Sequence, residues 1–398
     1  MIKRYNIYLN FYFLILLIFT YYFLFLKHQG GNDSTISEWM INYEGGFTKR
    51  GIIGQICIEF ARFFELNLRL VFLLFQSLIC TIYFFLLKNL LSQLKVERIL
   101  ILAIFSPIFI LYPIAEIEVL ARKEIFVFSL LLIHFLIPNK KYFKTLSLTL
   151  FTTISVLIWE PVVFFFPLIL IFEIIYNKIN KLNYGFYKIL FSFLPSIIIS
   201  LIFILQPLSL EQHNEMALVL KNEFGQTCYM SCRLLRDKSS ILQQFQGHYH
   251  LYSLEVITRY FLILLIGFFP LKLLIYNSEL KKKDLIIFRY FKNPLTPFLI
   301  CLIPVFLLFA MASDWGRWVN ITYVFFALIY FKLLLTNDIV LNLLKLKKGF
   351  IYKIKPKTFV IIFIIFCFGW NPKTSITGDI ASFPGYRVPY KVFKSLSN

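Results

Sequence analysis

The segment from Tyr5 to Leu26, YNIYLNFYFLILLIFTYYFLFL, decides the fold class of this protein. It contains no charged side chain and is as long as the roughly 20 apolar residues that a helix needs to cross a bilayer. Residues 1–4 precede it, and no small-residue cleavage site follows it. We therefore expect an uncleaved membrane anchor and not a removed signal peptide.

The composition extends this interpretation to the whole chain. Of the 398 residues, 59% are hydrophobic, 19% are aromatic and only 16% are charged, against roughly 25% charged in an ordinary soluble domain. A soluble fold of this length cannot bury so much apolar surface. The sequence predicts an all-α fold, a polytopic bundle of transmembrane helices forming one integral membrane domain (1–398). It argues against a cytosolic enzyme, a secreted disulfide scaffold and a disordered protein.

The apolar runs predict about eleven membrane spans by the same length criterion. They cover roughly 5–26, 68–90, 98–114, 124–138, 144–159, 161–177, 187–206, 258–276, 296–313, 319–335 and 357–370.

Lys and Arg gather in alternate short loops, which predicts a cytoplasmic N-terminus and an external C-terminal tail (371–398). Two longer segments, 27–67 and 207–257, then lie outside. The net charge of +20 comes mainly from the short loops predicted to be cytoplasmic, so it reflects membrane topology. We therefore expect no nucleic-acid partner. The sequence holds no phosphate-binding glycine loop, which argues against ATP-driven transport by this chain.

Two of the six cysteines, Cys228 and Cys232, lie four residues apart in the second outer segment. A disulfide between them and a pair of free thiols are both compatible with this spacing on an oxidising side of the membrane. Further ligands are lacking nearby, so we predict neither a metal site nor a cofactor.

The first outer segment carries a polar cluster: Trp39, Tyr43, Glu44, Lys49 and Arg50. Two glycines within it allow a tight turn. The stretch 51–60 that follows has the pattern of an amphipathic helix lying along the membrane surface. Together they predict a basic turn at headgroup depth, where a lipid phosphate would sit. An ordinary loop with snorkelling cations is the alternative.

A second cluster lies between the third and fourth predicted spans and consists of Glu116, Glu118, Arg122, Lys123 and Glu124. Charges at such depth usually pair or line a cavity. On a helix, Glu118 would pair with Arg122, four residues away, and Glu116 would share a face with Lys123. Structural pairing and a substrate role are both open here.

Two further clusters follow at the predicted outer ends of later spans. Glu160 stands between apolar residues, and such a carboxyl is either a general base or the partner of a cation. Asp314 and Arg317 are three residues apart and flanked by Trp315 and Trp318. These aromatic and charged groups suit sugar binding, while Arg317 suits a bidentate phosphate clamp.

All four clusters fall on the predicted outer face and none on the inner face, which predicts a one-sided site open to lipid. A diphosphate-linked glycan fits it, because the leaving diphosphate drives a transfer without ATP. We assign candidate catalytic roles to Glu160, Glu44 and Asp314. The predicted substrate-binding residues are Trp39, Tyr43, Lys49, Arg50, Glu116, Arg122, Lys123, Trp315 and Arg317.

The polar clusters also carry a resemblance to a known class of proteins. The motif residues are Trp39-x-x-Asn42-Tyr43-x-Gly45-Gly46-Phe47-x-x-Arg50-Gly51, Arg122-Lys123-Glu124, Glu160 and Asp314-Trp315-Gly316-Arg317-Trp318. The pattern resembles polytopic proteins of bacterial surface-polysaccharide clusters, including O-antigen and capsule repeat-unit polymerases. The resemblance implies a location in the bacterial inner membrane, undecaprenyl-linked glycans as substrates and other polysaccharide-assembly proteins as partners. A His often precedes the glutamate in that pattern, where this chain has Trp159.

Three functions remain open from the sequence. The first is a polymerase of polyprenyl-diphosphate-linked repeat units. The second is a glycosyltransferase of the GT-C type, which uses a polyprenyl-phosphate sugar and carries an acidic residue in its first outer loop, as Glu38 or Glu44 would provide. The third is a non-enzymatic flippase, which should carry charges toward both faces.

Overall fold

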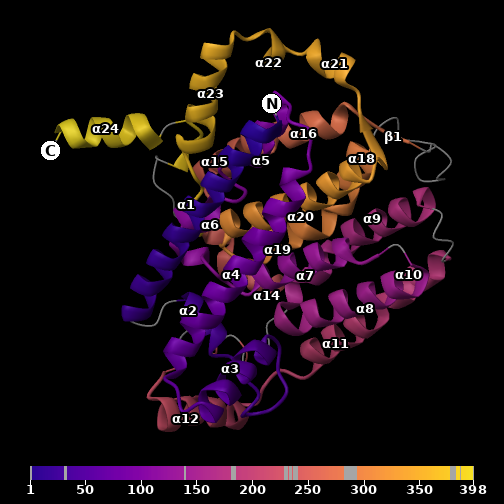
Figure 1. The fold of residues 1–398 in the computed structure, drawn as a ribbon. Helices are drawn as coiled ribbons and strands as arrows, with labels where there is room; N and C mark the ends of the chain where they lie inside the picture. The colour runs from indigo at the N-terminus through magenta and orange to yellow at the C-terminus, as the bar shows by residue number, and fades with distance from the viewer. Residues whose placement is uncertain are drawn as a thin grey trace.

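The protein is a bundle of helices with one two-stranded sheet in the described part of the chain (Figure 1). The computed structural model describes residues 2–30, 34–138, 140–180, 185–227, 232, 235, 241–281, 294–376, 382–385 and 387–397. This confirms the predicted helical fold class.

The helices of the first half begin with a long N-terminal helix and end in a run of paired helices. They are α1 (Ile2–Gln29), α2 (Ser34–Trp39), α3 (Gly51–Phe63), α4 (Leu68–Ser92), α5 (Arg98–Ile104), α6 (Tyr112–Ala115), η1 (Ile117–Val119), α7 (Glu124–Leu136), α8 (Lys141–Ile158), η2 (Glu160–Phe165), α9 (Phe166–Ile179), α10 (Phe186–Ser192) and α11 (Leu194–Leu205).

The second half contains the remaining helices and both strands. They are α12 (Leu210–Phe224), α14 (Ile241–His248), η3 (Tyr249–Leu251), α15 (Leu254–Gly267), α16 (Phe269–Tyr276), β1 (Ser278–Leu280), α18 (Leu295–Cys301), η4 (Ile303–Val305), α19 (Phe306–Met311), α20 (Trp315–Leu335), β2 (Ile339–Leu341), α21 (Leu343–Lys347), α22 (Phe350–Lys353), α23 (Pro356–Phe368) and α24 (Arg387–Ser397).

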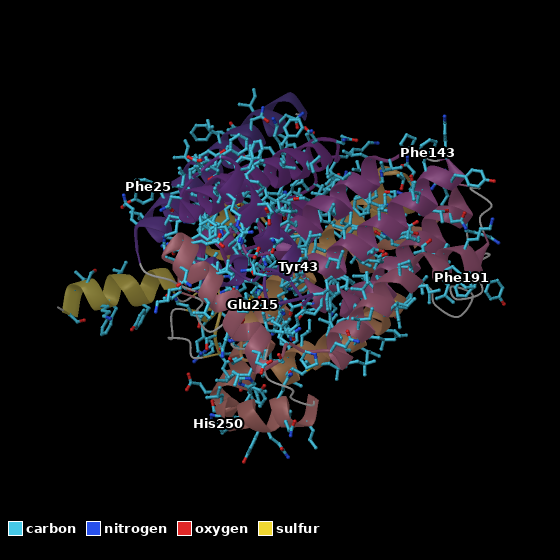
Figure 2. The ribbon with its side chains drawn as sticks, turned by 90° about the horizontal axis from the view of Figure 1, so that it is seen from below. Phe25, Tyr43, Phe143, Phe191, Glu215 and His250 are labelled. Carbon is cyan, nitrogen blue, oxygen red and sulfur yellow. The ribbon has the colours of Figure 1, made fainter. Side chains whose placement is uncertain are left out.

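Five helical segments among the described residues are long and apolar enough to cross a membrane. They cover Tyr5–Gln29, Leu68–Ser92, Glu160–Lys178, Phe186–Leu205 and Trp315–Leu335. A sixth candidate is bent by 100° between η3 and α15. Large apolar side chains also point outward at the edge of the molecule, as Phe25, Phe143 and Phe191 do in Figure 2. These features are those of a membrane protein.

Helix α20 forms the centre of the bundle, because its side chains are buried on nearly every face. Phe325 stacks on Phe165 with 4.4 Å between the ring centroids, and the Tyr323 hydroxyl donates to the carbonyl of Ala103 at 2.7 Å. A helix that is apolar all round is one that other helices or lipid surround. Here the surrounding elements include α4, α7, α9 and α15.

The predicted span 98–114 is not one helix, so that expectation was wrong. Helix α5 ends at Ile104, and Pro107 follows shortly after, where a helix would lack a backbone donor. The backbone that leaves the helix is buried. Its carbonyls at Ile108 and Phe109 accept hydrogen bonds from the amide of Asn320, at 3.0 and 2.9 Å. Irregular backbone inside a membrane bundle is tolerated when protein groups satisfy it in this way.

The two ends of the molecule are built from different parts of the chain (Figure 1). At one end lie the N-terminus, α21 and α22, and at the other lie α2, α3 and α12. Loops predicted to be cytoplasmic contact one another: β1 pairs with β2 in antiparallel register, and the Asn180 amide donates to the Asp338 carboxylate at 3.3 Å.

The two outer segments of the prediction also pack together. Helix α12 begins with a capping box formed by Ser209 and Gln212. Its backbone passes so close to Gly45 that a Cβ atom there would meet the Gln212 carbonyl at 1.8 Å. The guanidinium of Arg62 on α3 binds the Glu223 carboxylate through two hydrogen bonds, at 2.9 and 3.0 Å. Glycine at position 45 is therefore needed for this packing.

Candidate functional site

The site is organised by Glu38, which is 1% exposed and sits on the short helix α2. Its carboxylate accepts hydrogen bonds from Arg50 at 3.2 Å and Arg122 at 3.0 Å, and it lies 3.6 Å from Arg317. These cations come from three distant parts of the sequence. A carboxylate is favourable in so buried a place only when cations and hydrogen bonds compensate its lost hydration.

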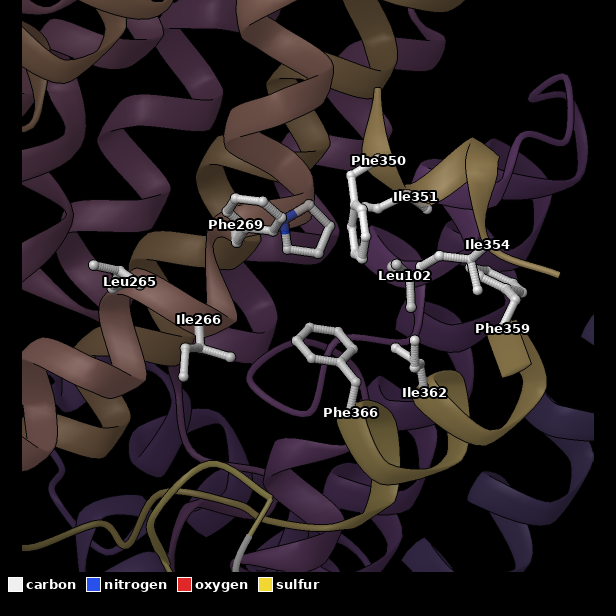
Figure 3. Close-up of a pocket in the computed structure, with 11 residues that line it drawn as sticks. Leu102, Leu265, Ile266, Phe269, Phe350, Ile351, Ile354, Phe359, Ile362 and Phe366 are labelled. Atoms are coloured by element: carbon white, nitrogen blue, oxygen red, sulfur yellow. The ribbon is translucent and has the colours of Figure 1, made fainter. Parts of the chain in front are cut away.

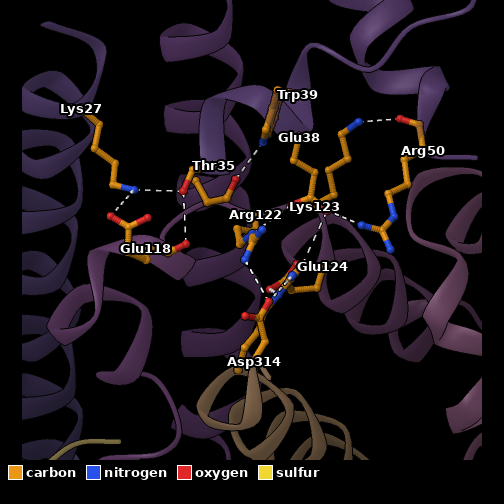
Figure 4. A network of polar contacts seen from close by, with 12 residues as sticks. Lys27, Thr35, Glu38, Trp39, Arg50, Glu118, Arg122, Lys123, Glu124 and Asp314 are labelled. Carbon is orange, nitrogen blue, oxygen red and sulfur yellow. Dashed lines mark hydrogen bonds and ion pairs between the residues drawn. The ribbon is translucent and has the colours of Figure 1, made fainter. Parts of the chain in front are cut away.

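Arg50 occupies an unusual backbone conformation at the start of α3. Its φ of 64° lies in the left-handed region, which costs energy for a residue with a side chain. The ammonium of Lys123 donates a hydrogen bond to the Arg50 carbonyl, as Figure 4 shows. This contact helps to hold Arg50 in its left-handed conformation, and that conformation directs the guanidinium into the cluster.

Two arginine–carboxylate forks join the cluster to neighbouring helices. Arg50 donates to both oxygens of Glu160, at 2.6 and 2.7 Å, and Arg317 donates to both oxygens of Glu124, at 2.8 and 2.7 Å. Such bidentate pairs fix geometry more strongly than a single hydrogen bond. The structure thus pairs Glu160 with an arginine, Arg50, and a cation partner was one of the two alternatives that the sequence left open.

Asp314 is the most loosely held carboxylate of the cluster. Its oxygen lies 3.6 Å from both Arg122 and Arg317, and its side chain is 33% exposed. Arg50 and Glu160 are each 21% exposed, while Arg317 and Glu124 are almost fully buried. The cluster therefore has a buried centre, and its partly exposed side chains are Asp314 and the Arg50–Glu160 pair.

The electrostatics of the cluster follow from burial and proximity. Burial by itself raises the pKa of Glu38, but the charges of the three arginines outweigh it and hold that pKa well below its ordinary value. Burial also lowers the pKa of Lys123 to about 7 and lowers the pKa of Lys49, which the Glu160 carboxylate opposes. The arginines keep their charge throughout the physiological range, while Lys123 can lose its proton within it.

Four carboxylates and five cations meet in this network. The carboxylates are Glu38, Glu124, Glu160 and Asp314, and the cations are Lys49, Arg50, Arg122, Lys123 and Arg317. The charges nearly balance, which is why so many can coexist away from water.

The aromatic candidates surround the cluster without entering its ion pairs. The indole of Trp39 donates to the carbonyl of Ala121 at 2.9 Å, and the indole of Trp315 donates to that of Phe309 at 2.7 Å. The ring of Tyr43 lies 5.4 Å from that of Phe47. The Arg317 guanidinium stands over the ring of Trp318 at 5.4 Å.

Two sequence candidates lie outside the network. Glu44 accepts hydrogen bonds from Arg62 at 2.9 Å and from Gln55 at 2.8 Å, and the Arg62 contact lowers its pKa. Glu116 instead lies 3.3 Å from the ammonium of Lys373. Among the described residues, neither carboxylate contacts the Glu38 cluster, so the structure gives them no place beside the other candidates.

The helical pairs expected in the second cluster were wrong. Glu118 lies 3.9 Å from Lys27, whereas Arg122 pairs with Glu38 and Lys123 with the Arg50 backbone. The reason is local: η1 is only three residues long, and Ala121 has a positive φ of 52°. An i,i+4 pair needs a continuous α-helix, and this segment is not one.

Sequence analysis did not identify the carboxylates of two ion pairs, Glu38 and Glu124. The sequence offers Glu38 only as an acidic residue of the first outer segment and gives Glu124 no separate role. Glu124 begins the apolar helix α7, Glu38 lies on the short helix α2, and a buried carboxylate usually has a cationic partner. That signal marks them as paired residues but does not reveal which arginine each one binds.

A second polar cluster lies near the opposite ends of the central helices, where the sequence predicted none. His134 shares a 2.8 Å contact with Glu173, and both are almost fully buried. The ammonium of Lys144 donates to the His134 carbonyl at 2.8 Å, and Lys332 donates to that of Phe135. The expectation of polar clusters on one face alone was therefore wrong, because these four polar residues gather at the other ends of the helices.

Other binding chemistry is limited in the described part of the chain. No group of three or more His, Cys, Asp or Glu side chains is placed there to hold a metal ion. Cys232 is disulfide-bonded, and Cys228 lies outside the described residues. Cys57, Cys80, Cys301 and Cys367 are free thiols.

Comparison with known proteins adds no assignment. No protein-family model, curated protein or solved structure matches this chain.

Proposed function

We propose that this protein is a membrane enzyme that polymerises polyprenyl-diphosphate-linked oligosaccharide repeat units at the outer leaflet of the bacterial inner membrane. The observation that carries the proposal is the pair of groups that the cluster leaves partly exposed. They are a fork-shaped guanidinium, Arg50, and a carboxylate, Asp314, which are linked through Glu38 and Arg122. A diphosphate and a sugar hydroxyl need these two kinds of group.

The proposed placement has the N-terminus in the cytoplasm and about eleven crossings, several of them by broken helices. The contacts support it, because predicted inner loops contact one another through β1 and β2, while the outer clusters meet around Glu38. The excess of Lys and Arg at the end that holds the N-terminus, α21 and α22 supports the same orientation.

Binding of the donor exchanges one anion for another. In the free protein, Glu160 occupies the Arg50 fork at 2.6 and 2.7 Å. Two oxygens of one phosphate group of the diphosphate can accept the same two hydrogen bonds and carry more charge, so the diphosphate can displace the carboxylate from the fork. Lys49, half-buried beside Glu160, would add a second cation. The polyprenyl tail would lie along the apolar surface of the bundle.

The transfer step then needs one base and one stabilised leaving group. The hydroxyl oxygen of the acceptor sugar attacks the anomeric carbon, and the bond from that carbon to the diphosphate oxygen breaks. The hydroxyl proton passes to Asp314, the most exposed and least tightly held carboxylate. The diphosphate leaves with the bonding electron pair, and Arg50 and Arg122 stabilise its charge. Glu160 holds Arg50 in place until the donor arrives.

A GT-C glycosyltransferase is the second candidate, and Glu38 is the observation that favours it. This carboxylate lies in the first predicted outer segment, as that class requires. However, it is 1% exposed and engaged by three arginines, which suits an organising role better than proton transfer. The other acidic residue of the segment, Glu44, is paired with Arg62.

A flippase would need a polar route between the two charged clusters. Glu124 and His134 belong to opposite clusters and both lie on α7, about 15 Å apart along the helix axis at 1.5 Å per residue. Phe128 and Leu131 are buried between them, and Phe165 stacks on Phe325 nearby in the core. This apolar packing speaks against a continuous polar route within the described residues.

The test is the length of surface glycan made by cells that lack this chain. A polymerase predicts single repeat units in place of a ladder, and restoration of the ladder by the wild-type chain. Loss of all glycan, or a ladder lacking one branching sugar, would instead indicate a single-sugar transferase. An unchanged ladder would refute both.

A further inference from the structure

A groove at the end of the molecule that holds α22 has only apolar side chains in its lining. Its volume is about 340 Å³, within the roughly 300–1,000 Å³ of ligand pockets. Figure 3 shows Phe269 and Ile266 on the left of it and Leu102, Ile362 and Phe359 on the right. The groove therefore lies between α22 and α23 and the helices α5, α15 and α16.

Arg98 fastens the outer wall of this groove to the bundle. Its guanidinium donates to the carbonyls of Ile351 at 3.2 Å and Ile354 at 2.9 Å, which are groups that a short helix leaves without partners. It also lies over the ring of Phe359 at 5.3 Å, and the Tyr352 hydroxyl donates to Glu97. The wall is thus a fixed part of the structure, with its apolar side toward the groove.

The segment that forms this wall is strongly basic. Six exposed lysines lie within it: Lys345, Lys347, Lys348, Lys353, Lys355 and Lys357. The sequence from 339 to 376 contains no Asp or Glu. The same segment exposes large apolar side chains, with Leu344 81% and Phe350 77% exposed. Lysines beside exposed apolar residues are typical of a segment that lies on a membrane surface.

We propose that this groove is a binding site for one anionic phospholipid of the bilayer. One acyl chain lies in the groove between Phe350 and Phe366, and the phosphate faces the lysines of α21 and α22. The small groove suits part of a single chain. Lysines on two neighbouring helical segments favour a lipid whose headgroup is anionic. The site is at the opposite end of the molecule from Glu38 and does not depend on the proposed function.

Competitive lipid retention tests the headgroup preference. The full chain is reconstituted in nanodiscs with equal phosphatidylglycerol and phosphatidylcholine, released, and weighed by native mass spectrometry to identify the lipid that stays bound. We expect phosphatidylglycerol to be retained about tenfold over phosphatidylcholine. Changing four lysines to glutamine (K345Q, K347Q, K348Q, K353Q) should abolish this preference, whereas changing the same four to arginine should keep it. Equal retention of both lipids by the wild type would overturn the proposal.

Filling the groove tests where the acyl chain lies. Ile362→Trp places a large ring among the lining residues, while Ile364→Trp puts the same ring on the exposed face of the same helix, outside the groove. We expect the first variant to lose the retained phosphatidylglycerol and the second to keep it. Retention by both variants overturns the groove as the site. Displacement of phosphatidylglycerol by equimolar undecaprenyl phosphate overturns the proposed occupant.

Discussion

Replacing Glu38 by glutamine should destabilise the protein far more than its small change in size suggests. The carboxylate is 1% exposed and compensates Arg50, Arg122 and Arg317 at 3.2, 3.0 and 3.6 Å. Glutamine has nearly the same shape but no charge, and its amide would turn a donor toward guanidiniums that are themselves donors. Removing one partner of a buried ion pair typically costs roughly 3–5 kcal/mol, because the other charge stays buried.

The expected shift in thermal stability follows from the size of the chain. An unfolding entropy of about 2.1 cal/mol/K per residue gives about 0.8 kcal/mol/K for 398 residues, so the loss lowers the midpoint by roughly 4–6 °C. The assay follows a thiol-reactive dye that labels Cys57 and Cys80 on unfolding, since both are buried free thiols.

Glu59→Gln is the matched control for this measurement. Glu59 also pairs with an arginine, Arg62, but the two side chains are 59% and 32% exposed, so its loss should cost less than about 1 kcal/mol. Combining Glu38→Gln with Arg122→Met should cost less than the sum of the two single changes, because each removes the other's unpaired charge. Equal midpoints for the Glu38 and Glu59 variants would refute the organising role of Glu38.

The remaining predictions concern catalysis, pH and sidedness. Asp314→Asn should reduce glycan polymerisation by about 10²–10⁴ at a normal protein level; a normal ladder would exclude Asp314 as the base. Arg50→Lys should shorten the glycan strongly, because lysine keeps the charge but loses the fork; wild-type ladder lengths would argue against a diphosphate clamp. The lowered pKa of Lys123, about 7, means that the unfolded chain binds more protons than the folded one from there up to about pH 10.4. Stability should therefore rise with pH across this window by up to about 1.4 kcal/mol per unit, and Lys123→Met should flatten the rise in thermal midpoint; identical slopes would contradict the burial of a cation there. A cysteine at the exposed position Glu59 should react with an impermeant maleimide on intact spheroplasts, and one at Lys347 only after lysis; the reverse pattern would invert the proposed topology.

The position of proline explains why some predicted spans are continuous helices and the span 98–114 is not. The continuous runs around α1, α4 and α20 contain long apolar stretches without proline, so hydropathy alone identified them. The run 98–114 is also apolar, but Pro107 follows the end of its helix. The buried carbonyls that lack a helical partner there accept hydrogen bonds from Asn320, which is far away in the sequence. Hydropathy records how apolar a segment is and not whether its backbone is helical.

The sequence also placed most of the candidate site correctly in one group, for a simple reason. Charged residues at the ends of apolar helices are costly unless they meet, so predicted sidedness was enough to expect Arg50, Arg122, Glu160 and Arg317 near one another. Which partner each one takes depended on backbone geometry. The positive φ of Arg50 and the non-helical segment before Lys123 redirect side chains that a regular helix would have paired locally.

The sequence by itself determined that this chain is helical and apolar enough for a membrane, because composition and run length act residue by residue. Only the tertiary structure decided that Glu38 collects three arginines, that Glu44 and Glu116 pair elsewhere, and that His134 meets Glu173 inside the bundle. A buried charge selects its partner by distance in space, within a few ångströms. Those distances arise from helix packing that joins separate segments, as with Glu38 and Arg122, which are 84 residues apart, and no local pattern in the sequence encodes it.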